Sequence, residues 1–106
     1  MTSAFRSIVI FALVACGESR PRTSILLPEP AAQEAPLPIR EDCVLAEEKC
    51  TRCHTIGRVL MAQAHTRAEW EPFVRRMRLM ASSGITEHDA DAVLRCLEFR
   101  GEQGAR

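Results

Sequence analysis

The sequence has no surplus charge of either sign, because 14 lysines and arginines balance 14 aspartates and glutamates. Without a basic surplus, nothing points to nucleic acid as a partner. Long apolar runs are also lacking near the N-terminus. The run at residues 7–15 holds about nine residues, too few to cross a bilayer core of about 30 Å as a helix. Strand alternation, hairpin turns and internal repeats are absent as well, which leaves helix as the regular structure to expect.

Catalytic constellations are missing too. The sequence has no Ser-His-Asp pattern, no glycine-rich phosphate loop and no paired carboxylates in an apolar context. We therefore expect a protein that is not an enzyme.

The N-terminal segment has the pattern of an export signal, with Arg6 followed by the apolar run. Its end, Leu13-Val14-Ala15-Cys16, resembles the lipobox of bacterial lipoproteins. The resemblance implies a signal peptide at residues 1–15, lipid on Cys16 and a periplasmic protein anchored to a membrane. Gly17 is not the aspartate that often retains lipoproteins in the inner membrane, which favours the outer one. An ordinary signal peptide that contains a cysteine is the alternative.

Residues 16–39 hold five of the six prolines and show no helical or strand period. They predict a disordered, lipid-anchored tether with a reach of about 70 Å at about 3.1 Å per residue. The folded domain is then expected at residues 40–106.

Three helices are predicted in that domain, which makes its fold class all-α. The first covers residues 41–49, with acidic residues in its first turn. The second begins near Thr66, where Thr66 and Glu69 form a capping-box pattern ahead of an apolar face. The third begins at residues 86–89, and Gly101 and Gly104 predict a frayed tail.

Residues 50–54 read Cys-Thr-Arg-Cys-His, the C-x-x-C-H signature of haem c attachment. Two thiols three positions apart can reach the two vinyl groups on one edge of a porphyrin. The imidazole of His54 then faces the iron from one side. We therefore predict one covalent haem c on Cys50 and Cys53, with His54 as an iron ligand.

A structural zinc site and a thioredoxin-like redox pair are two other interpretations of these cysteines. A structural zinc site needs four ligands, which Cys43, Cys96, His65 and His88 could complete, but no second C-x-x-C or H-x₃₋₅-H follows. A thioredoxin-like redox pair needs a βαβ context that the sequence lacks. Neither interpretation explains why a histidine directly follows Cys53.

With these residues in place, the chain resembles the small monohaem class I-like c-type cytochromes, in the form of a bacterial lipoprotein. The resemblance covers roughly residues 43–99. It rests on the attachment motif with Gly57 and Arg58 after it, on W-x₃-V-x-x-M at Trp70, Val74 and Met77, and on a closing helix. It implies a three-helix domain around the haem, and one-electron transfer with periplasmic or membrane redox proteins.

Such cytochromes usually complete the iron with a methionine from the C-terminal half. The resemblance favours Met77 over Met80, and His65 or His88 would instead give a bis-histidine haem. Arg58 is a candidate partner for a haem propionate. Because the first and last helices of the resembling fold pack together, the resemblance also implies a Cys43–Cys96 disulfide.

The sequence therefore predicts a membrane-anchored electron carrier with a single haem. The alternative is a haem-based ligand-binding or sensing module whose sixth ligand is weak or absent. A third hypothesis is a zinc- or disulfide-stabilised lipoprotein with no redox role.

Overall fold

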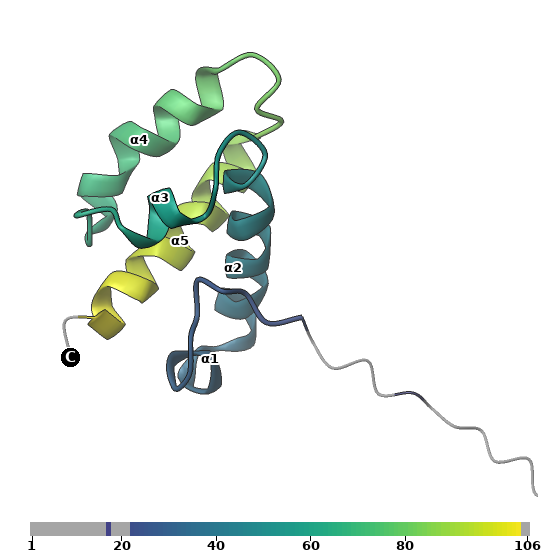
Figure 1. Cartoon of the computed structure of the whole chain (residues 1–106), viewed down its shortest axis with the longest axis vertical. Coiled ribbons are helices and arrows are strands. Elements are labelled where there is room, and N and C mark those ends of the chain that lie inside the picture. Colours follow the sequence, from purple (N-terminus) through teal and green to yellow (C-terminus); the bar gives the residue numbers. More distant parts are fainter. Residues whose placement is uncertain (1–16, 18–21, 105–106) are drawn as a thin grey trace, which may run out of the picture.

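The computed structural model describes Gly17 and residues 22–104, and the regular structure of this part is all helical (Figure 1). The prediction of an all-α protein is therefore confirmed. The predicted signal peptide and the lipidation site at Cys16 lie outside the described residues. The helices are α1 (Ala31–Glu34), α2 (Leu37–Cys50), α3 (Gly57–Leu60), α4 (Arg67–Leu79) and α5 (Glu87–Gly104).

The three longer helices form the core. Helix α5 packs against α2 on one side and against α4 on the other, with the short α3 in front of it in Figure 1. Buried side chains of all five helices belong to one cluster, whose helical members are Ala32, Cys43, Ala46, Cys50, Val59, Trp70, Val74, Val93, Leu94, Cys96 and Leu97. No helix in the described part is long and apolar enough to cross a membrane.

The starts of α4 and α5 follow the capping pattern of the sequence. The Glu69 backbone N–H donates to Thr66 Oγ1, and Glu69 Oε2 accepts from the Thr66 N–H at 2.9 Å. Thr86 and Asp89 repeat this exchange at α5, with both bonds at 3.0 Å. These bonds to backbone N–H groups lower the pKa of both carboxyls, Glu69 and Asp89. Each of these two helices therefore begins where a side chain accepts from a backbone N–H group that has no partner within the helix.

Helix α2 begins four residues earlier than the predicted start at Glu41. Pro36 is its N-cap and Pro38 lies in its first turn. Proline is tolerated there because the first helical N–H groups have no partner within the helix. The prolines that suggested a tether thus lead into the helix.

The predicted tether at residues 16–39 needs a larger correction. From Ser24 onward this segment folds onto the domain, and we call residues 24–35 the strap. Leu26 is 0% exposed and Leu27 is 2% exposed, and both belong to the same cluster as the helices. The Ile25 N–H donates to Glu47 Oε2 at 3.2 Å, and Arg40 Nε donates to the Ala35 carbonyl at 2.9 Å. The folded domain therefore starts about sixteen residues before the predicted boundary.

The C-terminal residues differ from the prediction too, since α5 continues to Gly104 and no frayed tail begins at Gly101. A Cβ at Gly101 would overlap the backbone carbonyl of His65. Glycine thus lets α5 approach the segment before α4 while the helix runs on through it.

Candidate functional site

The C-x-x-C-H motif lies where α2 ends. Cys50 is the last residue of the helix, and Thr51 caps it by donating from Oγ1 to the Glu47 carbonyl at 2.7 Å. Cys50 is buried, whereas Cys53 on the following turn is exposed, and both thiols are free. The two sulfurs therefore differ in environment: one faces the core and the other faces solvent.

Burial raises the pKa of the Cys50 thiol to about 11. A thiol of such pKa is protonated at neutral pH and reacts slowly as a nucleophile. Cys50 is therefore held as an apolar, neutral group against the core, which is compatible with attachment chemistry that begins from reduced thiols.

His54 is half-buried beside the two cysteines. Its Nδ1 lies 3.2 Å from the carbonyl oxygen of Thr55. When Nδ1 carries the proton and donates to this carbonyl, the lone pair of Nε2 is left for a metal. A backbone carbonyl in this position orients the ring in the way that is common for metal-binding histidines.

A small cavity joins the motif to the end of α4. Its volume is about 40 Å³ and its walls are almost entirely apolar. Five predicted haem-site residues lie around it, together with three that were not predicted; the lining is Lys49, Cys50, Cys53, His54, Met77, Met80, Ser83 and Ile85. The attachment motif and both candidate methionines thus meet in space, although more than twenty residues separate them along the chain.

Two methionines at the end of α4 line this cavity. Met77 lies in the helix, whereas Met80 is its C-cap residue and has extended backbone. Met77 is half-buried and packs against the core, whereas Met80 is 60% exposed. The exposed part of Met80 is apolar surface beside the motif.

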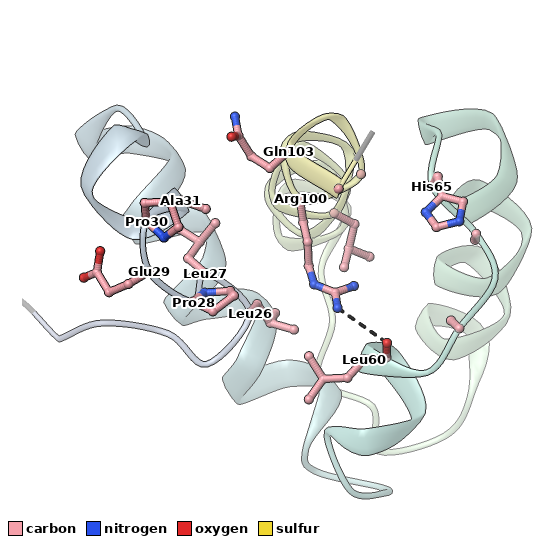
Figure 2. Close-up of a pocket in the computed structure, with 15 residues that line it drawn as sticks. Leu26, Leu27, Pro28, Glu29, Pro30, Ala31, Leu60, His65, Arg100 and Gln103 are labelled. Carbon is pink, nitrogen blue, oxygen red and sulfur yellow. Dashed lines mark hydrogen bonds between the residues drawn. The ribbon is translucent and has the colours of Figure 1, made fainter. Parts of the chain in front are cut away.

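The other predicted ligands lie elsewhere. His88 and Arg58 are exposed, and neither lines the cavity at the motif. His65 lines a separate, larger cavity of about 350 Å³ between the strap, the segment before α4 and the end of α5 (Figure 2). In that cavity, Arg100 Nη2 donates to the Leu60 carbonyl at 3.5 Å. For the bis-histidine alternative, His54 is the one histidine among the described residues that line the cavity at the motif.

Sequence reasoning missed Lys49, Ser83 and Ile85. Lys49 directly precedes the motif, and it is the one lysine in the sequence. Ser83 and Ile85 follow α4 in a loop without helical period, so no sequence pattern indicated that they return to the motif.

Cys43 and Cys96 lie at disulfide bonding distance, with their sulfurs 2.06 Å apart. A bridge across 53 residues restricts the unfolded chain and contributes about 4 kcal/mol by loop-closure entropy. It also engages two of the cysteines that a zinc site could have used. Among the described residues, no group of three or more His, Cys, Asp or Glu side chains is placed to hold a metal ion.

The donor set at the motif fits a covalently bound haem. Two free thiols, one imidazole with an oriented ring and two thioethers surround apolar space, and the exposed part of Met80 would be covered by a flat apolar ring. The enclosed 40 Å³ is smaller than the roughly 300–1,000 Å³ of pockets that enclose organic ligands. Accommodation of a porphyrin therefore requires the end of α4 to move away from the motif.

Comparisons with protein-family models, curated proteins and solved structures find no match to this chain.

Proposed function

We propose that this chain is a membrane-anchored c-type cytochrome that transfers single electrons through one covalently attached haem. The observation that carries the proposal is the shared cavity, which gathers Cys50, Cys53, His54 and the methionines of α4. The C-x-x-C-H spacing alone would match many unrelated cysteine pairs. A thioether donor opposite the motif is the additional feature that a haem carrier needs.

Each residue has a distinct role in this proposal. Cys50 and Cys53 would hold the ring by thioether bonds, and Nε2 of His54 would bind the iron while the Thr55 carbonyl orients the imidazole. Met77 is the preferred sixth ligand, because it packs against the core and lines the cavity with the motif, whereas Met80 is 60% exposed. Haem bound in this way supplies one-electron chemistry, and a methionine ligand raises its potential relative to a second histidine.

The proposal extends to the location of the protein. The lipobox-like residues before Cys16 support lipid anchoring at the periplasmic face of a membrane, with the outer membrane favoured by Gly17. The closely spaced Cys43 and Cys96 suit an oxidising compartment, where a disulfide persists. Partners would be redox proteins of the periplasm or the membrane.

A sensing role is the second candidate, and the exposure of Met80 favours it. If Met80 rather than Met77 were the ligand, its largely exposed side chain would be easily displaced by a small molecule. Carbon monoxide binding to the reduced protein separates the two roles, because a firm methionine ligand blocks it.

The test of haem attachment is expression with and without a c-haem maturation system, followed by a pyridine haemochrome spectrum of the denatured protein. We expect a covalent haem signal only with the maturation system. The double variant Cys50→Ala, Cys53→Ala should lose this signal. The matched control is Cys43→Ala, Cys96→Ala, which removes the other two cysteines of the domain and should retain it. A wild-type protein without covalent haem would refute the proposal.

The ferric iron–methionine absorption band then identifies the sixth ligand. We expect Met77→Ala to abolish the band and Met80→Ala to preserve it. The opposite result would assign Met80, and a wild type without the band that binds carbon monoxide would favour the sensor.

A further inference from the structure

Lys49 makes two contacts that connect the end of α2 to the loop between α4 and α5 and to the first turn of α5. Its Nζ donates to the Gly84 carbonyl at 2.9 Å and forms an ion pair with Asp89 Oδ2 at 3.3 Å. The side chains of Lys49 and Asp89 are only 13% and 15% exposed. Charge-assisted bonds shielded from water in this way are stronger than ion pairs on an open surface.

The loop between α4 and α5, which contains Gly84, is held by its own hydrogen bonds. Ser83 Oγ donates to the Arg78 carbonyl at 3.1 Å, and the Ser83 N–H donates to the Met80 carbonyl at 3.2 Å. Ser82 and Gly84 both have positive φ, 65° and 62°. A conformation of this kind persists only where surrounding contacts hold it. A displacement of Gly84 would therefore also displace the last turn of α4, to which the loop is hydrogen-bonded.

A second side chain reinforces the contact from the motif itself. The guanidinium of Arg52, inside C-x-x-C-H, lies so close to Gly84 that a Cβ there would collide with it. Arg52 also approaches Glu48 on α2. Lys49 directly precedes Cys50, and Arg52 follows it by two residues. The side chains of both approach Gly84.

We propose that Lys49 is a positioning residue for the sixth iron ligand. By bonding Gly84 and Asp89, it anchors the loop that follows α4, and so limits how far the thioether of Met77 moves from the attachment motif when the space for the haem opens. This inference rests on the proposed haem function. Lys49 itself touches neither iron nor substrate; it acts through the loop that fixes α4.

A physical consequence follows from competition at the iron. An added ligand such as imidazole binds only in molecules whose methionine has moved away, so its apparent affinity depends on the fraction of open molecules. Loss of the Lys49 bonds frees the loop and increases that fraction. The electron-transfer site would then bind added ligands more readily although no iron ligand has changed.

The experiment compares imidazole binding to the ferric holoprotein of wild type, Lys49→Met and Lys49→Arg. We expect Lys49→Met to bind imidazole about tenfold more tightly, as the loss of a charge-assisted hydrogen bond implies. The ferric iron–methionine band should weaken in parallel. Lys49→Arg keeps the charge and donors and should restore most of the wild-type behaviour.

Arg95→Met is the matched control. Arg95 pairs with Asp42 at 2.8 Å and so also links α5 to α2, but neither residue lines the cavity at the motif. The Arg95→Met variant should lower the free energy of unfolding and leave the affinity for imidazole unchanged. If Lys49→Met fails to fold, Asp89→Asn replaces it in the imidazole experiment, with the same expected result. Asparagine keeps a side-chain oxygen to accept from the Thr86 N–H but removes the charge that pairs with Lys49.

Equal imidazole affinities in Lys49→Met, Arg95→Met and wild type would overturn the inference. The pyridine haemochrome spectrum separates this outcome from failure of the function itself. A wild type without covalent haem refutes the proposed function and the inference with it. A wild type with haem and no methionine band refutes the inference alone, since Lys49 would then hold no ligand in place.

Discussion

At the scale of single residues, the two thiols of the motif are unequal. Cys50 is 2% exposed and has a pKa of about 11, whereas Cys53 is exposed. A pKa of about 11 instead of 9.0 leaves about 100-fold less thiolate at neutral pH. The inequality comes from the fold, because it buries one of two identical side chains and leaves the other, three residues later, exposed.

This inequality predicts stepwise alkylation of the protein that carries no haem. At pH 7, iodoacetamide should modify Cys53 well before Cys50, as peptide mass spectrometry at timed quenches would resolve. The thiolate fraction of Cys50 grows as pH rises toward about 11, so the lag between the two sites should narrow in alkaline buffer. Urea-unfolded protein, in which burial is lost, is the control and should show equal rates. Equal rates in the folded protein at pH 7 would contradict the described burial of Cys50.

The residues of the candidate site were predictable to different degrees. Cys50, Cys53 and His54 form a contiguous motif, so the sequence alone could single them out as candidate site residues. Met77 and Met80 could both be proposed, with Met77 favoured by the resemblance alone. The difference in their burial could not be predicted, because it depends on α4 ending at Leu79. Lys49 was not predictable as a site residue, since its partners Gly84 and Asp89 lie 35 or more residues away and reach it only through the fold.

At the scale of elements, helix ends that depend on local contacts were predicted well and those that depend on packing were not. The caps Thr66–Glu69 and Thr86–Asp89 exchange hydrogen bonds within three residues, which a sequence pattern captures. The end of α5 depends instead on what it packs against. Gly101 suggested a frayed tail because glycine weakens isolated helices, but here its missing side chain permits a close approach to His65.

Gly101→Ala therefore should destabilise the protein, against the usual preference of helices for alanine. The new Cβ would collide with the His65 carbonyl, and a backbone group cannot rotate away as a flexible side chain can. We expect a loss of about 1–3 kcal/mol in the free energy of unfolding, measured by urea titration. Gly104→Ala is the matched control in the same helix, where a Cβ meets nothing within 4 Å, and it should cause no loss. A neutral or stabilising Gly101→Ala would show that α5 does not approach this segment so closely.

At the scale of the whole molecule, the strap changes the relation between the domain and its proposed anchor. If the tether extended from Cys16 to residue 39, its reach would be about 70 Å. Among the described residues, the first buried one is Ser24, only eight positions after Cys16, which limits the reach to about 30 Å. The proposed lipid on Cys16 would then hold the folded domain close to the membrane, with little freedom to swing between distant partners. Sequence reasoning missed this because prolines in a short folded segment and in a tether look alike.

Leu26→Ala tests whether the strap is part of the fold. Its side chain is 0% exposed within the cluster shared with α2 and α5, so its truncation should cost about 2–5 kcal/mol of unfolding free energy. Ile25→Ala removes a similar side chain one residue away that is 52% exposed, and its backbone bond to Glu47 remains. That control should lose less than about 1 kcal/mol. The comparison is best made by urea unfolding of the protein that begins at Gly17, with the Cys43–Cys96 bridge oxidised. If the two variants unfolded at the same urea concentration as wild type, the strap would be a tether after all, and the longer reach from Cys16 would return with it.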